Sequence, residues 1–195
     1  MFFKDLKPKP GAVIETILVN VHLPVKLGHK DANKLFAEPL KAQLAAASLG
    51  TVLDCRLRKR ASGSVRGVDL YIGLRDATQD ALLTIARMLE ALSAPCGSSI
   101  RMADGIADPL VFGTTEGLEM SIASHLAPGP DERRDLAKTC HDAIGSMGVS
   151  RGWDQFDDRT KFYFYGEDFS EMKERIGKRL QGHPRYGDAL LRRMA

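Results

Sequence analysis

Apolar and polar residues alternate in several short segments of the chain, and this alternation predicts β-strands. In residues 15–24 (ETILVNVHLP), every second residue from Ile17 to Leu23 is apolar, so these side chains share one face of a strand. Strand-like segments recur along the chain, at residues 51–60, 65–75, 97–103, 116–126, 149–156 and 160–166. The tail, residues 188–195 (DALLRRMA), is a further strand by analogy, although taken alone it also fits one or two turns of helix.

Between these segments, apolar residues recur at helical spacing. Four helices are predicted, at residues 31–48, 76–93, 131–148 and 168–180. Asp31 and Asp76 are expected as N-caps, and Asp168 with Glu171 has the spacing of a capping box. Pro39 lies inside the first helical pattern, so a kink or a restart of the helix is expected there.

The order of elements is βαββαβ in the first half of the chain and recurs in the second. Residues 69–89 (DLYIGLRDATQDALLTIARML) and 161–180 (KFYFYGEDFSEMKERIGKRL) both run from an apolar-aromatic strand through an Asp into a helix. This arrangement resembles the ferredoxin-like split βαβ fold used twice, and the resemblance is one of topology alone. We therefore predict an α+β protein of two ferredoxin-like halves with antiparallel sheets, at residues 11–102 and 116–195, joined by a connector at 103–115.

In such a fold, two helices cover one face of each sheet and leave the other face open. Residues 159–168 (RTKFYFYGED) place four aromatic residues in a row, so Phe162 and Phe164 are expected in the core. Tyr163 and Tyr165 then point to the open face. The same parity places further residues of the second half on that face, of which Trp153 and Lys161 complete our candidate binding surface. Two interpretations stay open: this surface is exposed and binds a partner, or it fills a seam between the halves or between copies.

A basic hairpin is the second candidate site. Its cations lie within eleven residues around the loop 61–64 (ASGS): Arg56, Arg58, Lys59, Arg60 and Arg66. Such a cluster can bind an anionic ligand, nucleic acid or an acidic protein surface. It can also be a solvated hairpin whose charges prevent pairing at the sheet edge.

The sequence gives little sign of catalysis. It lacks Gly-x-Ser-x-Gly, a phosphate-binding glycine-rich loop and His-Glu-x-x-His. The histidines and three cysteines show no spacing typical of a metal site, so we expect no metal and no cofactor. If a catalytic site exists, His22 with Asp54 or Tyr71, on one open sheet face, is where we would look first.

Charge argues against nucleic acid as the partner. The segment KFYFYG resembles the RNA-recognition motif only loosely, because it lacks the glycine after the basic residue. Residues 1–102 contain 15 Lys and Arg against 9 Asp and Glu, whereas residues 103–195 contain 13 against 16, so the aromatic residues lie in the acidic half.

Composition indicates a folded protein of the cytoplasm. The chain has 195 residues, 44% hydrophobic, and its apolar segments are too short to span a bilayer. The start, MFFKDLKPKPG, does not have the pattern of a signal peptide, and unpaired cysteines fit a reducing compartment. We expect a non-catalytic binding protein that contacts another protein or itself, in an adaptor, regulatory or toxin-neutralising role. The alternatives are regulation by a small ligand bound between the halves, an enzyme, and nucleic-acid binding.

Overall fold

The computed structural model describes residues 16–61, 63–103, 105 and 108–194. The N-terminal leader, for which we expected no signal peptide, and residues 11–15 of the predicted first half lie outside the described residues.

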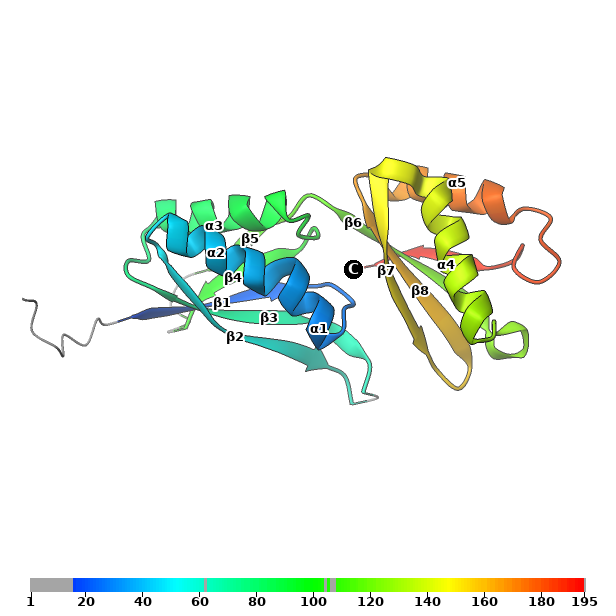
Figure 1. The fold of residues 1–195 in the computed structure, drawn as a ribbon, viewed down its shortest axis with the longest axis horizontal. Coiled ribbons are helices and arrows are strands. Elements are labelled where there is room, and N and C mark those ends of the chain that lie inside the picture. Colours follow the sequence, from blue (N-terminus) through cyan, green and yellow to red (C-terminus); the bar gives the residue numbers. More distant parts are fainter. Residues whose placement is uncertain (1–15, 62, 104, 106–107, 195) are drawn as a thin grey trace, which may run out of the picture.

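The first half is a five-stranded antiparallel sheet with its helices on one face (Figure 1). The strand order is β2-β3-β1-β4-β5. The elements are β1 (Ile17–Leu23), α1 (His29–Ala32), η1 (Asn33–Ala37), α2 (Glu38–Ala46), β2 (Gly50–Lys59), β3 (Val65–Leu74), α3 (Gln79–Ala91), β4 (Ser98–Met102) and β5 (Leu110–Phe112). Strand β5 lies in the predicted connector, where it pairs with β4 and extends the sheet by one edge strand.

The second half repeats this architecture with a four-stranded antiparallel sheet in the order β7-β8-β6-β9. The elements are β6 (Glu116–Ala123), η2 (Ser124–Leu126), α4 (Pro130–Ile144), η3 (Gly145–Met147), β7 (Gly148–Gln155), β8 (Arg159–Gly166), α5 (Phe169–Leu180) and β9 (Leu190–Arg193). The tail is therefore a strand, as expected by analogy. Apart from β5, both sheets have the same order of strands, so the protein is α+β with two ferredoxin-like halves.

The helix starts were predicted with mixed success. Asp168 caps α5 by accepting a hydrogen bond from the Glu171 N–H at 2.8 Å, as predicted. Helix α3 instead begins after Thr78, whose hydroxyl accepts from the Ala81 N–H, so the expectation of Asp76 as its cap was wrong. The first helix begins at His29, which makes Asp31 part of the helix and not its cap.

Pro39 does interrupt the first helical segment. A π-helical turn, η1, spans the five residues before Glu38, and regular α-helix resumes at Glu38 with Pro39 in its first turn. The residues before Pro39 are themselves helical, and the Glu38 N–H donates to the Asn33 carbonyl five residues back. Proline has no N–H to continue this series of bonds, so the irregular turn lies beside it.

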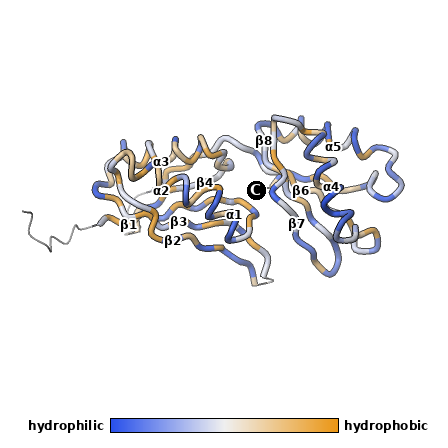
Figure 2. The backbone as a smooth tube through the Cα atoms, viewed as in Figure 1, coloured by the Kyte–Doolittle hydropathy of each residue, from blue (hydrophilic) through white to orange (hydrophobic). Residues whose placement is uncertain are grey.

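Each half buries its own apolar core between sheet and helices. Phe36 and Ile85 lie in the first core, and Phe162 and Phe164, which are 0% exposed, lie in the second. Figure 2 shows hydrophobic and hydrophilic residues alternating along α4 and α5, as expected of helices that cover a sheet with one side only. No helix among the described residues combines the length and the apolar character needed to cross a membrane.

Candidate functional site

The two tyrosines of β8 lie in a seam between the halves. Tyr163 and Tyr165 point away from the helices of their own half and are only 4% and 3% exposed. They pack, with Val149 and Met194, against the core cluster of the first half, and the Tyr165 hydroxyl accepts a hydrogen bond from the Lys26 N–H at 2.8 Å. The interpretation as an exposed surface is thus corrected for these two rings, because the first half covers them.

Trp153 does not join them, because a β-bulge reverses the parity of β7. Ser150 pairs with Phe164 and Trp153 with Phe162, so one extra residue lies between the two pairs. Gly152, at φ +99°, occupies the bulge in a conformation that favours glycine. Trp153 therefore shares the helix-covered face with Phe162, and the centroids of the two rings are 6.1 Å apart. The Trp153 side chain thus lies outside the predicted binding surface.

The five cations of the basic hairpin do not form one patch. The guanidinium groups of Arg56 and Arg58 bind Asp54 and Asp69 at 2.6 and 3.0 Å on the outer face of the first sheet. The other three cations are exposed and lie beyond this face: Lys59, Arg60 and Arg66.

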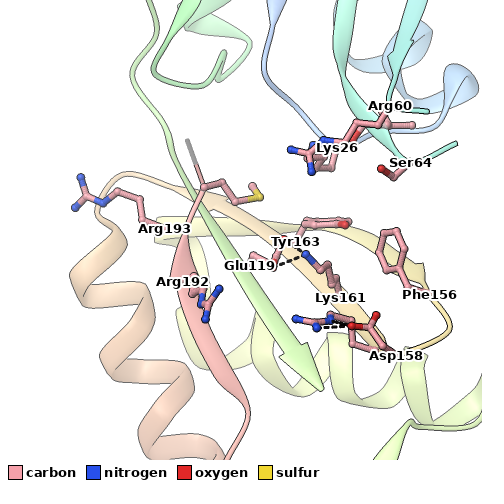
Figure 3. Close-up of a pocket in the computed structure, with 13 residues that line it drawn as sticks. Lys26, Arg60, Ser64, Glu119, Phe156, Asp158, Lys161, Tyr163, Arg192 and Arg193 are labelled. Atoms are coloured by element: carbon pink, nitrogen blue, oxygen red, sulfur yellow. Dashed lines mark hydrogen bonds and ion pairs between the residues drawn. The ribbon is translucent and has the colours of Figure 1, made fainter. Parts of the chain in front are cut away.

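Arg60 lines a groove of about 410 Å³ that both halves form (Figure 3). We call this the inter-half groove. The first half contributes residues after β1 and around the basic hairpin: Lys26, Arg60, Ser64 and Val65. The second half contributes residues of β6, of the β7–β8 hairpin and of β9: Glu119, Phe156, Asp158, Arg159, Lys161, Tyr163, Arg192, Arg193 and Met194.

Positive charge prevails in the inter-half groove, since six of its lining residues are Lys or Arg and two are acidic. Lys161 pairs with Glu119 at 2.9 Å, as a dashed line in Figure 3 shows. Arg159 pairs with Asp158. Arg193 pairs with Glu116, beside the groove, at 2.9 Å. Three cations remain without a carboxylate partner among the described residues: Lys26, Arg60 and Arg192.

Lys26 is the most constrained of these three. Its Nζ donates to the carbonyl of Val65 at 2.6 Å, which orients the ammonium, while its backbone N–H holds Tyr165. Burial, and next the positive charge of Arg60, lower the pKa of the Lys26 ammonium. A bound anion would relieve both effects, because it would solvate the ammonium and offset the repulsion.

The outer face of the first sheet holds a separate polar network. His22 Nδ1 lies 2.7 Å from Asp69 Oδ1, and Arg58 donates to the other oxygen of the same carboxylate. The partner of His22 is therefore Asp69, whereas Asp54 binds Arg56 and Tyr71 lies beneath the Arg56 guanidinium at 5.0 Å. This arrangement satisfies both oxygens of a nearly buried carboxylate, which is the usual condition for burying a charge.

No group of three or more His, Cys, Asp or Glu in the described part of the chain is placed to hold a metal ion.

Sequence reasoning found only part of the inter-half groove. It selected Lys161, Tyr163 and Arg60, but as members of two unrelated surfaces. Lys26 and Arg192 carried no signal, because only the docking of the halves brings them together.

No family model matches the chain, and no curated protein matches it. Among solved structures, a protein of unknown function from Galdieria sulphuraria is 13% identical, with a TM-score of 0.29, and the match covers 92% of this chain and 98% of that one. A protein described as "Putative Chlorite dismutase" is 12% identical, with a TM-score of 0.26, and the match covers 92% and 95%. Similarities this low carry no argument about function.

Proposed function

We propose that this protein is a non-catalytic binding protein that takes a small anionic ligand into the inter-half groove. The observation that carries the proposal is the set of three cations, Lys26, Arg60 and Arg192, that line one groove without a carboxylate partner among the described residues. Phosphate and carboxylate groups are the ligands such cations bind best, because charge-assisted hydrogen bonds are shorter and stronger than neutral ones.

The size of the groove supports a small molecule. A volume of about 410 Å³ lies within the range of sites for metabolites and cofactors, roughly 300–1,000 Å³. Residues from both halves line it, so a ligand that contacts both would favour their docked arrangement. That is a simple physical basis for a regulatory role.

Titration calorimetry with pyrophosphate at low salt, on the wild type and two single variants, tests this proposal. Arg60→Gln removes a cation of the groove, whereas Arg66→Gln removes one from the same hairpin that does not line the groove. Losing one charged hydrogen-bond donor should weaken binding about 10-fold or more in Arg60→Gln, while Arg66→Gln should stay within about twofold of wild type. Equal losses in both variants, or no binding to the wild type, would refute a specific site.

An acidic protein partner at the hairpin tip is the second candidate. Lys59 and Arg66 are exposed, and the structure gives neither side chain an ion pair with any described residue. They are free to meet carboxylates of another protein, in line with an adaptor or toxin-neutralising role. Pull-down with the double variant Lys59→Gln/Arg66→Gln separates the two functions. The variant should lose a protein partner yet keep pyrophosphate binding.

A further inference from the structure

The geometry points to a more specific ligand for the inter-half groove, namely a phosphate ester whose other part is a flat aromatic ring. This inference rests on the proposed function and adds a second subsite to it. The phosphate would lie by Lys26 and Arg60, and the ring would lie against Phe156 at the end of the groove formed by the β7–β8 hairpin (Figure 3).

Phe156 provides the first argument, because its ring belongs to neither core. It is half-buried, lines the groove, and is absent from both hydrophobic clusters. Its backbone N–H donates to the Arg159 carbonyl at 2.8 Å, so the hairpin turn fixes the position from which the ring projects. A fixed, partly exposed phenyl ring beside cations is a surface on which another ring can stack.

The charges beside Phe156 provide the second argument. The Lys161 ammonium lies 5.7 Å from the centre of the Phe156 ring, and Glu119 neutralises this ammonium at 2.9 Å. At this end of the groove the charges are therefore balanced, because Arg159 pairs with Asp158 as Lys161 does with Glu119, and the Phe156 ring lies among them. In the roof, by contrast, Lys26 and Arg60 lack a carboxylate partner among the described residues. A ligand that matches both ends needs an anion at one end and a ring at the other.

The remaining neighbours agree with this division. Tyr163 forms the floor between the two ends, and its hydroxyl is held by Asp154 at 3.1 Å. Val65 and Met194 add apolar surface to the lining. The lining of the groove thus offers contacts for a ring joined to a phosphate, as in an aryl phosphate or a mononucleotide.

The experiment compares phenyl phosphate with methyl phosphate by calorimetry, since these two monoesters differ only in the ring. The wild type should bind phenyl phosphate at least about fivefold more tightly, as expected for one aromatic stacking contact. Phe156→Leu should abolish this preference and leave the affinity for methyl phosphate within about twofold. Tyr71→Leu, on the outer face of the first sheet, is the matched control and should keep the preference.

The outcomes separate this inference from the proposed function. If both esters bind equally well to the wild type, or if Phe156→Leu keeps the preference, the aromatic subsite is refuted and the anion site remains. If neither ester nor pyrophosphate binds, the proposed function fails and this inference fails with it. Affinity for single-stranded oligonucleotides that rises with length far beyond that for a mononucleotide would overturn the assignment of a small ligand.

Discussion

The two sheets present equivalent outer faces to very different surroundings. Strands β3 and β8 occupy the same place in their sheets, and Tyr71 of β3 corresponds to Tyr163 of β8. Tyr71 lies opposite Asn20 in the first sheet, and Tyr163 lies opposite Glu119 in the second. Tyr71 is half-buried under a guanidinium, whereas Tyr163 is buried by the other half of the chain. The same backbone thus supports a solvent-facing polar surface in one half and a docking surface in the other.

One reversal of large and small residues accompanies this difference. In the first sheet Leu18 lies opposite Gly73, and in the second Gly117 lies opposite Tyr165. The large residue has moved from the first strand of its half to the third. There its hydroxyl reaches the backbone of Lys26, beside the groove. The seam and the inter-half groove share Tyr163 and Met194, and Tyr165 of the seam holds the backbone of Lys26, which lines the groove, so stability and ligand binding should be coupled.

Alkaline pH should have the largest effect on the free energy of unfolding, because it acts on several buried thiols and phenols at once. Burial raises the pKa of the Cys55 thiol to about 11 and that of Cys140 to about 12, and burial also raises the pKa values of Tyr163 and Tyr165. The unfolded chain ionises its thiols near pH 9 and its phenols near pH 10. Above about pH 9, unfolding therefore releases protons. The stabilisation from these buried groups is fully present below about pH 9, and the free energy of unfolding falls as the pH rises to about 12.

Urea midpoints at a series of pH values between 8 and 11.5 measure this loss. Cys140→Ala removes one of the buried thiols and should make the decline shallower, whereas Cys96→Ala, at an exposed thiol, should leave its slope unchanged. A midpoint independent of pH up to 11 would show that the buried groups ionise as freely in the folded protein as in the unfolded chain.

Truncating matched tyrosines should give the next largest effect. Tyr165→Ala removes a ring that is 3% exposed and should cost about 3–5 kcal/mol of unfolding free energy. Tyr71→Ala removes a half-buried ring with one cation contact and should cost about 1 kcal/mol. Chemical denaturation of both variants measures the difference. Similar costs would mean that the seam contributes little to the free energy of unfolding.

This contrast marks the limit of what the sequence could predict. Alternation and helical spacing predicted the helices of both halves and the strands other than β5, because those patterns reflect which side of an element meets its own core. They could not say what covers the opposite face. The tyrosines of β8 look the same in sequence whether they meet solvent, a partner or the first half.

Local irregularities account for the other errors. A bulge in β7 adds one residue to the strand, so Trp153 faces the helices although strict alternation placed it on the outer face. Glycine at position 152 was a signal for this bulge. The inter-half groove depends on five segments far apart in the chain. The sequence shows that the cations of the groove exist, but it does not show that they lie close together in the folded protein.

Removing only the Tyr165 hydroxyl should have a smaller effect than removing the ring. Tyr165→Phe leaves the ring in the seam but deprives the half-buried Lys26 N–H of its acceptor, which should cost about 1–2 kcal/mol. Tyr71→Phe is the control on the other sheet and should change stability by less than about 0.5 kcal/mol. Denaturant midpoints test both, and the proposed coupling also predicts weaker pyrophosphate binding in Tyr165→Phe. Unchanged affinity together with lowered stability would separate the seam from the ligand site.

The smallest effect is expected on the outer face of the first sheet. Arg58 is 48% exposed and donates twice to Asp69, so Arg58→Gln loses a partly screened ion pair. Asp69 keeps its bond to His22, which limits the cost to about 1 kcal/mol or less. Urea denaturation at pH 7 measures this cost. The variant should also bind pyrophosphate as the wild type does, because Arg58 does not line the inter-half groove. A cost near that of Tyr165→Ala would show that the solvent-facing network stabilises the fold as strongly as the seam does, and the contrast between the two sheet faces would then be wrong.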